Sequence, residues 1–529
     1  MTLYRRLFLS AALGALALAT ASAQAQTPAR SLVIAKNIAD IISLDPAQTF
    51  EFTGGEIVSN IYDRLVQYDV DEPTKLQPGL AESWKTSADG KTIVFALRDA
   101  KFASGNPVRP EDVVFSFARV IRLKKSPAFI LAQLGWTPEN VEQMVRKTGD
   151  REVSVTFAGN FSAAFALNAI AARPGAIVDQ VEAMKNEKGG DMGNEWLGQN
   201  SAGSGPFRLL RVRAAEVATL AANPTHFRGA PPMQQVIYRH VPEAGAQRLL
   251  LEKGDVDIAR DVGPDDLETI AKTPGLRVER YPAATVHFFT LNLKHEKLRN
   301  PAVWEAMRWL VDYEGMSQKL LRGTMRVHQA FLPVGFPGAL EETPYKLDVA
   351  KARDILAKAG IQNLEVEMDV IDGQPFNGMA QALQATMAQA GIKVSIVPGA
   401  AAQVISKYRA RNHQLMLIYW NPDFMDAHSN AKAFSYATDI SDANPQSTTT
   451  WRNNWLIPEL SKRTMDALGE TDPARRAAMY RDLQKDVMAQ SPFVIMFQAQ
   501  NTVALRAGVQ GYKQGVVNDL ILYRGVNKQ

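Results

Sequence analysis

The spacing of hydrophobic residues along the chain alternates between a strand-like and a helix-like period. The segment 92–97 (TIVFAL) has strand propensity throughout, and the apolar positions over 113–121 recur at helical spacing. A second apolar stripe lies between Asp348, which can cap the start of a helix, and Gly360, which can end it. These patterns predict a strand at 92–97, a helix that Pro110 opens and that continues through 121, and a helix over 348–360.

The same order of elements returns in the second half of the chain. Apolar residues share one helical face over 379–390, and the sequence 392–396 (IKVSI) then alternates as a strand. A helix is expected from Asp472-Pro473, and the all-apolar run 493–497 (FVIMF) suits a buried strand. Because the chain has 529 residues, roughly three to four times the length of a typical domain, this alternation predicts an α/β protein of more than one lobe.

The first 25 residues have the composition of a cleavable export signal. Arg5 and Arg6 precede the apolar run 7–19, and small residues follow at 21–25 in an A-x-A cleavage pattern. The apolar run is shorter than the roughly 20 residues that span a membrane. We therefore expect residues 1–25 to be a cleaved signal peptide, with an uncleaved anchor as the alternative. The Sec and the twin-arginine export routes both stay open.

Charge and cysteine content narrow the possible functions. The 59 Lys and Arg residues nearly balance the 55 Asp and Glu residues, so the net charge is only +4 and we expect no nucleic-acid partner. The sequence contains no cysteine. This excludes disulfides, zinc–thiolate and iron–sulfur sites, a cysteine nucleophile and a lipidated N-terminal cysteine.

Enzyme motifs are absent or incomplete. The sequence has no phosphate loop, no G-x-G-x-x-G fingerprint and no H-E-x-x-H zinc helix. Ser204 lies in the tetrapeptide GSGP, which is one glycine short of a nucleophile elbow. None of the seven histidines has another at the helical spacing of metal ligands. We expect no catalytic residue, no metal site and no cofactor, with a secreted hydrolase as the alternative.

A further series of motifs is spread in order along nearly the whole chain. Its members are 43–46 (SLDP), 60–66 (NIYDRLV), 78–84 (PGLAESW), 87–98, 101–116, 204–207 (SGPF), 252–257 (EKGDVD), 300–306 (NPAVWEA), 350–360 and 480–492. The block from 78 to 116 is the most specific. The series resembles the family 5 extracellular solute-binding proteins, which are periplasmic receptors of ATP-driven importers for peptides, nickel complexes, opines and some sugars.

The resemblance implies a two-lobed periplasmic-binding-protein fold (type II, cluster C-like) with a discontinuous first lobe and an extra subdomain. The expected boundaries are 26–285 for lobe I, with the subdomain inserted at about 60–195, then 286–495 for lobe II and 496–529 for the return to lobe I. The β-prone runs 281–292 and 493–499 are the expected crossovers. The ligand is expected between the lobes, where hinge closure buries it.

The resemblance also assigns ligand-binding residues. In peptide-binding relatives the aspartate of a W-x-x-D segment pairs with the ligand's α-ammonium, and here the segment 419–426 (YWNPDFMD) places it at Asp423. Trp420 would form an aromatic wall, and Tyr419 and Asn421 belong to the same segment. The alternative is that Asp423 caps a loop and that Trp420 packs in the core.

Two more segments are expected at the cleft. The stretch after the SLDP motif lines the cleft in relatives, which places Phe50, Glu51 and Phe52 there, and His287 lies on the first crossover. For the two phenylalanines and for His287, plain core packing is the alternative. A residue for a ligand carboxyl group is not located: the run 415–418 before Trp420 is apolar, and Lys407, Arg409 and Arg411 are open candidates.

The resulting hypothesis is a periplasmic peptide receptor of a Gram-negative cell. It would capture di- or oligopeptides and deliver them, as a monomer, to an ABC permease in the inner membrane. The alternatives within the same fold are an opine, an oligosaccharide or a nickel chelate as the ligand. The nickel version has little support from the sequence, because His428 is the only histidine near Asp423.

Overall fold

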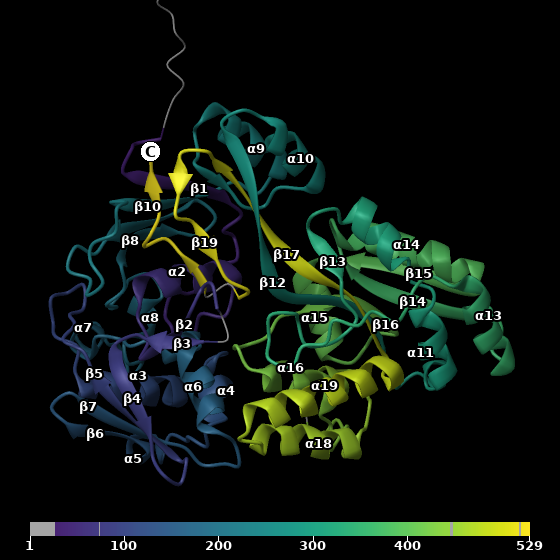
Figure 1. Ribbon diagram of the computed structural model, residues 1–529, viewed down its shortest axis with the longest axis horizontal. Helices are drawn as coiled ribbons and strands as arrows, with labels where there is room; N and C mark the ends of the chain where they lie inside the picture. Colours follow the sequence, from purple (N-terminus) through teal and green to yellow (C-terminus); the bar gives the residue numbers. More distant parts are fainter. Residues whose placement is uncertain (1–26, 73–74, 445–447, 518–519) are drawn as a thin grey trace, which may run out of the picture.

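One mixed β-sheet of 11 strands joins the two halves of the molecule (Figure 1). The computed structural model describes residues 27–72, 75–444, 448–517 and 520–529, so the expected signal peptide at 1–25 lies outside the described residues. The strands in sheet order are β15 (Ile392–Gly399), β14 (Leu364–Ile371), β16 (Leu415–Trp420), β12 (Leu276–Leu291), β17 (Phe493–Arg506), β11 (Ile258–Ala259), β1 (Ser31–Lys36), β10 (Gln235–His240), β9 (Val217–Ala222) and β8 (Phe207–Arg213), with β13 (Met325–Val327) also paired to β17.

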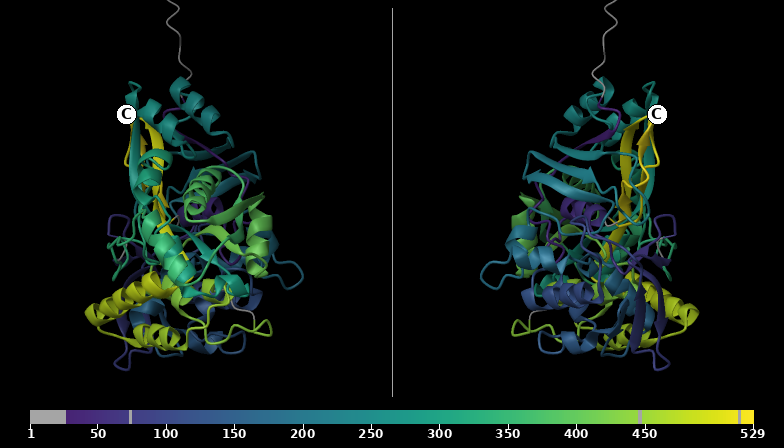
Figure 2. Two further views of the ribbon diagram at one scale, coloured as in Figure 1. Left: turned by 90° about the vertical axis from the view of Figure 1, so that its right-hand side faces the viewer. Right: turned by 90° about the vertical axis from the view of Figure 1, so that its left-hand side faces the viewer.

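The two longest strands, β12 and β17, run antiparallel through both halves. Their register extends from Leu276 opposite Arg506 to Thr290 opposite Phe493, and it shifts between Pro282 and Val286. The side views show β17 rising from the level of α19 (Pro473–Gln490) toward the top of the molecule (Figure 2). Both runs that the sequence marks as β-prone crossovers are therefore strands, and the expected lobe boundaries fall within them.

We call the part built on β11, β1, β10, β9 and β8 lobe I, and the part built on β16, β14 and β15 lobe II. The helices of lobe I are α2 (Phe52–Ile61), α7 (Gln180–Lys185), α8 (Asn194–Leu197), α9 (Ala244–Lys253) and α10 (Pro264–Lys272). Those of lobe II are α11 (Pro301–Arg308), α12 (Tyr313–Gly315), α13 (Val349–Lys358), α14 (Phe376–Gln389), α15 (Ala401–Arg409), α16 (Ala427–Ser435), α17 (Thr449–Arg452), α18 (Pro458–Gly469) and α19, with short turns η2 (Glu296–Leu298) and η3 (Met316–Leu320).

A separate four-stranded antiparallel sheet forms the subdomain beside lobe I, at the lower left of Figure 1. Its strands in order are β4 (Ala81–Thr86), β5 (Thr92–Leu97), β7 (Glu152–Thr156) and β6 (Val145–Gly149), and its helices are α3 (Pro110–Leu123), α4 (Ala128–Ala132), α5 (Val141–Met144) and α6 (Ala163–Ala171). The turn η1 (Arg173–Gly175) follows α6. Two-stranded pairs complete the chain: β2 (Val66–Tyr68) with β3 (Leu76–Pro78), β18 (Val509–Gln510) with β21 (Asn527–Lys528), and β19 (Lys513–Gln514) with β20 (Ile521–Leu522).

The local signals in the sequence produce the elements that they predict. The Asp348 carboxylate accepts a hydrogen bond of 2.8 Å from the Lys351 amide at the start of α13. Gly360 follows that helix with a φ of 69°, a left-handed conformation that glycine adopts without strain. Asp472 caps α19 in the same way, through the Arg475 amide at 2.8 Å.

Motifs that lie far apart in the sequence pack against each other. The Ser204 hydroxyl, in the SGPF motif, donates a 2.9 Å hydrogen bond to the Asp63 carboxylate of the NIYDRLV motif. A Cβ atom on Gly203 would lie 2.0 Å from the Ile61 carbonyl oxygen, so only glycine allows this approach. Ser204 is buried at this junction. Its role here is structural.

A buried ion pair attaches the subdomain to lobe I. The Arg119 guanidinium of α3 donates to the Asp45 carboxylate of the SLDP motif with an Nη1–Oδ1 distance of 2.6 Å. Asp45 and Arg119 are 0% and 1% exposed, so neither charge can be solvated by water if the other is lost.

Replacing Arg119 by alanine should therefore lower the free energy of unfolding by about 3–5 kcal/mol, because it leaves a buried carboxylate unpaired. Urea denaturation followed by circular dichroism measures this. The matched control is Arg122→Ala on the same helix, whose ion pair with Glu142 is exposed and should contribute about 1 kcal/mol or less. Equal losses in the two variants would contradict the prediction.

Candidate ligand-binding site

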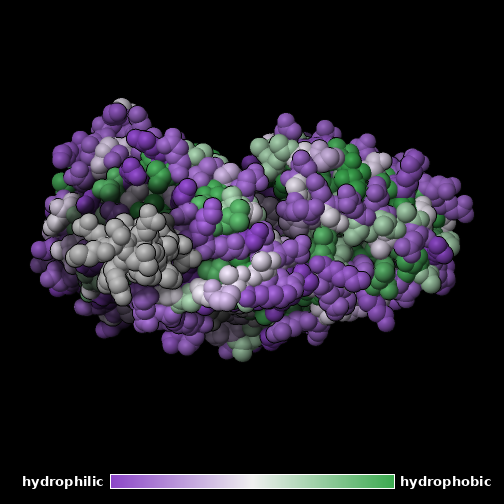
Figure 3. Space-filling model, turned by 90° about the horizontal axis from the view of Figure 1, so that it is seen from above, coloured by the Kyte–Doolittle hydropathy of each residue, from purple (hydrophilic) through white to green (hydrophobic). Residues whose placement is uncertain are grey.

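A cavity of ≈ 680 Å³ lies on the lobe I side of the two crossover strands. It opens where the parallel strands β1, β10 and β11 end, at Lys36, Pro242 and Arg260, and its far wall is the middle of β17 at 500–502. The carboxyl edge of parallel strands is a common place for a ligand in open α/β sheets. Seen from above, the molecule is hollowed between its two halves, and apolar patches interrupt a mostly polar surface (Figure 3).

The cations on the cavity wall are already paired. Lys36 and Arg260 bind the carboxylate of Glu56 on α2, with N–O distances of 3.0 and 3.2 Å. Burial tends to raise the pKa of Glu56, but Arg260 and Lys36 outweigh it and lower the pKa to about 2. Glu56 thus stays ionised, and it fixes the helix whose first residue is Phe52.

Four aromatic rings from four segments meet between the lobes. The Tyr419 ring centroid lies 6.5 Å from Phe52, 6.1 Å from His287 and 6.1 Å from Phe376. His287 and Phe376 are 5.7 Å apart. We call these four residues the ring cluster. It brings together three residues that the sequence analysis predicts for the cleft, and adds Phe376, which that analysis misses.

Phe50 and Glu51 lie apart from the ring cluster. The Phe50 ring contacts Phe129 of α4 edge to face, at 6.3 Å. Phe50 and Phe52 are 41% and 39% exposed, which does not fit the alternative of core packing. The Glu51 side chain accepts a 3.2 Å hydrogen bond from the Phe50 amide, while Arg173 donates to the backbone oxygens of Thr49 and Glu51. This arrangement fixes the backbone that presents the two phenylalanines.

His287 is a buried histidine with unused hydrogen-bonding capacity. It is 6% exposed, and burial lowers its pKa to about 4, so the ring is neutral near pH 7. Its Nδ1 atom has no hydrogen-bond partner within the described part of the chain. A buried polar atom without a partner is costly, and a polar group of a ligand beside the ring cluster could satisfy it.

Asp423 lies in the loop between β16 and α16 and is partly exposed. Its amide donates to the Ser429 hydroxyl at 3.0 Å, but among the described residues its carboxylate has no hydrogen-bond or ion-pair partner. Burial raises the pKa of Asp423 to about 7, although Arg452, Lys432 and Arg173 act in the opposite direction. The side chain is therefore a partly exposed acid that has no direct ion-pair or hydrogen-bond partner among the described residues, although three cations act on its pKa.

The residues before Asp423 are anchored by the surrounding structure. The Trp420 indole N–H donates to the Asn430 side chain at 3.2 Å, and its ring meets Phe434 edge to face at 6.0 Å. The Asn421 side-chain oxygen accepts from the Thr285 hydroxyl at 3.1 Å. Trp420 thus packs partly into the core, as the alternative interpretation expects, and half of the predicted segment serves to orient the loop.

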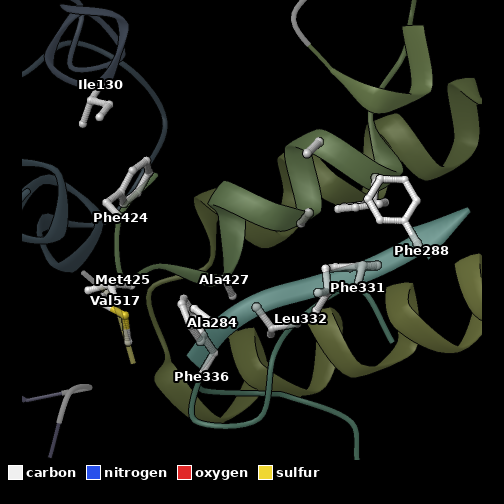
Figure 4. Close-up of a cluster of buried hydrophobic side chains, with 14 of the residues drawn as sticks. Ile130, Ala284, Phe288, Phe331, Leu332, Phe336, Phe424, Met425, Ala427 and Val517 are labelled. Atoms are coloured by element: carbon white, nitrogen blue, oxygen red, sulfur yellow. The ribbon is translucent and has the colours of Figure 1, made fainter. Parts of the chain in front are cut away.

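The residues after Asp423 contact the subdomain (Figure 4). The Phe424 ring lies 5.6 Å from Phe165 of α6, and the Met425 amide donates to the Tyr68 hydroxyl at 3.3 Å. Asp426 accepts from Asn168 of α6 at 3.3 Å and pairs with Arg476 at 2.7 Å. One loop therefore carries Asp423 and, directly beside it, the contact between lobe II and the subdomain.

Of the three basic residues that the sequence leaves open for a ligand carboxyl group, two are already paired with aspartates and the third is exposed on a helix. Lys407 pairs with Asp369 at 2.6 Å, and Arg411 pairs with Asp442 at 2.8 Å. Arg409 is exposed on α15.

His428, the histidine nearest to Asp423 in the sequence, is buried, and its ring centroid lies 5.8 Å from that of Phe165. Within the described ranges, no group of three or more His, Asp or Glu side chains could hold a metal ion, and no helix there could cross a membrane.

Residues 75–442 match the model of the bacterial extracellular solute-binding proteins, family 5. The chain belongs to this family. It is 29% identical over 496 residues to the probable D,D-dipeptide-binding periplasmic protein DdpA of Escherichia coli, a match that covers 93% of this chain and 92% of DdpA. These findings confirm the family that the motifs predict.

Solved structures confirm the two-lobed fold class. The periplasmic binding protein DppA from Helicobacter pylori in complex with the peptide STSA matches with a TM-score of 0.79 at 22% identity, over 94% of this chain and 98% of that one. AgaA of A. tumefaciens in complex with agropinic acid matches with a TM-score of 0.75 at 22% identity, over 94% and 99%.

Replacing Asp423 by asparagine should stabilise the ligand-free protein, and more so at pH 8 than at pH 5. The raised pKa means that the folded state binds this proton more tightly than the unfolded state, so the contribution of the carboxyl group to stability is lost as the pH rises from about 4 through about 7. The expected gain at pH 8 is on the order of 2 kcal/mol, discounted for partial exposure. Denaturant unfolding at both pH values measures it.

The control for this experiment is Asp426→Asn in the same loop. Burial raises the pKa of Asp426, but Arg476 lowers it further, so the net shift is downward. That carboxylate stabilises the fold above its unfolded pKa, and its loss at pH 8 should cost about 3–5 kcal/mol. A stabilisation by Asp423→Asn that is the same at pH 5 and pH 8 would contradict the assignment of a raised pKa.

Proposed function

We propose that this protein is the periplasmic substrate-binding protein of an ABC importer and that it binds short peptides between its lobes. The observation that carries the proposal is the Asp423 carboxylate, whose pKa is raised by burial and which has no direct ion-pair partner among the described residues. A peptide α-ammonium supplies the missing charge, and a charge-assisted hydrogen bond in such a site is strong. The relatives support the same ligand class, since DdpA and a Pseudomonas aeruginosa relative of 28% identity are named as probable dipeptide- and di/tripeptide-binding proteins.

The ring cluster, which includes the exposed Phe52, and the nearby exposed Phe50 suit the side chains of such a peptide. Phe52, Tyr419 and Phe376 form an apolar surface of adaptable shape, which accepts side chains of different sizes without specific hydrogen bonds. His287 offers one hydrogen-bonding atom to the peptide backbone. The protein binds and releases its ligand without chemical change, and it works as a monomer that docks on an inner-membrane permease after removal of the signal peptide at 1–25.

Native mass spectrometry of protein purified gently from its own periplasm tests the ligand class. Co-purified masses that fit di- to pentapeptides support the proposal. A single mass of an opine, an oligosaccharide or a nickel chelate would keep the receptor role and overturn the peptide ligand.

Asp423→Ala should weaken peptide binding by roughly 100-fold or more, because the ligand ammonium is then desolvated without a partner. Isothermal titration calorimetry with a bound dipeptide and with its N-acetylated form completes a double-mutant cycle. The acetylated peptide should bind the wild-type protein weakly and lose little further affinity in the variant. If both peptides lose affinity equally, the ammonium does not lie on Asp423.

Peptide affinity should also fall with pH below about 7. Only the ionised form of Asp423 attracts an ammonium group, so each pH unit below its pKa in the free protein costs up to about tenfold in affinity. Titrations at pH 8 and pH 5 should differ by roughly 100-fold for the wild-type protein. They should differ little for Asp423→Asn, and parallel profiles would contradict the role of this carboxyl group.

A further inference from the structure

The lobe I end of the 11-stranded sheet has one buried face and one exposed face. β8 is the edge strand there, and β9 and β10 follow it, at the opposite end of the sheet from β15 (Figure 1). Side chains alternate between the two faces of a sheet along each strand. On one face, Phe207, Leu209, Leu220, Val236 and Tyr238 are 8% exposed or less and pack in a core with α2. The polar residues of these strands therefore lie on the opposite face.

An irregularity in β8 brings its arginines onto that opposite face. The register steps from Leu209 directly to Arg211 against consecutive residues of β9, so Leu210 is an extra residue of the kind that forms a β-bulge. Arg208 and Arg211 are three positions apart, and in a regular strand they would lie on opposite faces. With the extra residue, both share the exposed face with Arg213.

The pairing with β9 and β10 adds a fourth arginine to this face. Arg213 lies opposite Val217, and Val217 lies opposite Arg239 on its other side. The two arginines of this row are thus separated by two strand spacings, about 10 Å. We call Arg208, Arg211, Arg213 and Arg239 the arginine face. The remaining positions of the rows are neutral: Val217, Thr219, Ala221, Gln235 and Ile237.

The arginine face is exposed, and little of its charge is compensated. α9 and α10 pack on the same side of the sheet over β1 and reach Ile237 of β10, while all four arginines remain exposed. Arg213 pairs with Glu216 at 3.6 Å, an exposed pair of small effect. The other three arginines form no ion pair within the described part of the chain. Since the net charge of the whole sequence is only +4, positive charge is concentrated on this face.

We infer that the arginine face binds the phosphate groups of an anionic phospholipid surface. A guanidinium presents a planar fork of donors that matches a phosphate, and all four cations here are arginines. They stand on a sheet rather than around a cavity, which suits an extended array of anions. Their separation of about 10 Å is close to the Debye length at 0.1 M salt, so their charges act together on such an array.

This inference goes beyond the proposed function and does not depend on the ligand class. No member of the arginine face lines the ≈ 680 Å³ cavity, so a protein held at a membrane by this face keeps its ligand site open. Attraction by a few arginines is reversible and is weakened by salt. It would concentrate the receptor at the membrane that contains its permease without anchoring it there.

Co-sedimentation of the full mature protein with sucrose-loaded vesicles tests the inference. Vesicles of phosphatidylethanolamine and phosphatidylglycerol should bind the protein at 50 mM NaCl and release most of it at 200 mM NaCl, whereas phosphatidylcholine vesicles should bind little at either concentration. Each basic residue near an anionic surface contributes roughly fivefold in partitioning. The double variant Arg211→Gln, Arg239→Gln should therefore partition roughly 10-fold or more weakly.

The matched control removes two exposed positive charges from lobe II, by Arg481→Gln and Lys485→Gln on α19. It changes the net charge equally and should leave partitioning within about twofold of wild type. Circular dichroism checks that both double variants are folded. Equal losses in the two variants, equal binding to neutral vesicles, or no binding to anionic vesicles at 50 mM NaCl would overturn the inference.

A soluble polyanion separates a lipid from an acidic protein as the occupant. Poly-L-glutamate should bind much more weakly than the anionic vesicles at equal charge concentration, because its carboxylates are not held in a surface. Binding to it that is equally tight and equally dependent on Arg211 and Arg239 would overturn lipid as the occupant and assign the face to an acidic polypeptide. None of these outcomes bears on the peptide ligand, so this inference and the proposed function fail separately.

Discussion

The pairing of β12 with β17 is the constraint on which the rest of the structure depends. β16, β14 and β15 extend the sheet from the lobe II end of β12, and β11, β1 and β10 extend it from the lobe I end of β17. The two lobes therefore share one hydrogen-bonded sheet. Relative motion of the lobes must concentrate where the ladder is interrupted, between Pro282 and Val286.

Gln498 compensates for that interruption. Its side-chain amide donates to the Ala283 carbonyl at 2.8 Å and to the Val334 carbonyl at 3.0 Å, and its side-chain oxygen accepts from the Val334 amide at 3.0 Å. Backbone groups that leave the ladder thus keep partners inside the molecule, as buried polar groups require. His287 of the ring cluster and Thr285, whose hydroxyl binds Asn421, lie within five residues of this point, so a movement here would displace the ring cluster and the loop that carries Asp423.

Sequence patterns predict the local elements far better than they predict the site. The helices after Asp348 and Asp472 follow from caps and apolar stripes that act over a few residues, and both form as expected. The ring cluster depends on contacts between residues that are 43 (Phe376 and Tyr419) to 367 (Phe52 and Tyr419) positions apart in the sequence, so no local pattern marks Phe376. The resemblance points to Asp423, Tyr419 and His287, of which the last two lie in the ring cluster, but it does not choose among Lys407, Arg409 and Arg411 for a ligand carboxyl group. Their ion pairs, which join Lys407 to Asp369 and Arg411 to Asp442, are visible only in the structure.

Some acidic side chains in this structure have a direct ion-pair partner, and Asp423 has none among the described residues. This difference bears on how a ligand could favour contact between lobe II and the subdomain. Glu56 and Asp45 are buried beside cations and stabilise a fixed scaffold. Asp423 has no direct partner among the described residues, and the next two residues of its loop, Phe424 and Met425, are buried, with Phe424 against Phe165 of the subdomain. Burying those side chains favours contact between lobe II and the subdomain by about 1.5–3 kcal/mol each. The unpaired carboxylate opposes the same contact. If a ligand ammonium binds Asp423 as proposed, it would remove that opposition without adding to the apolar contact, and the ligand would then favour the arrangement in which lobe II and the subdomain are in contact.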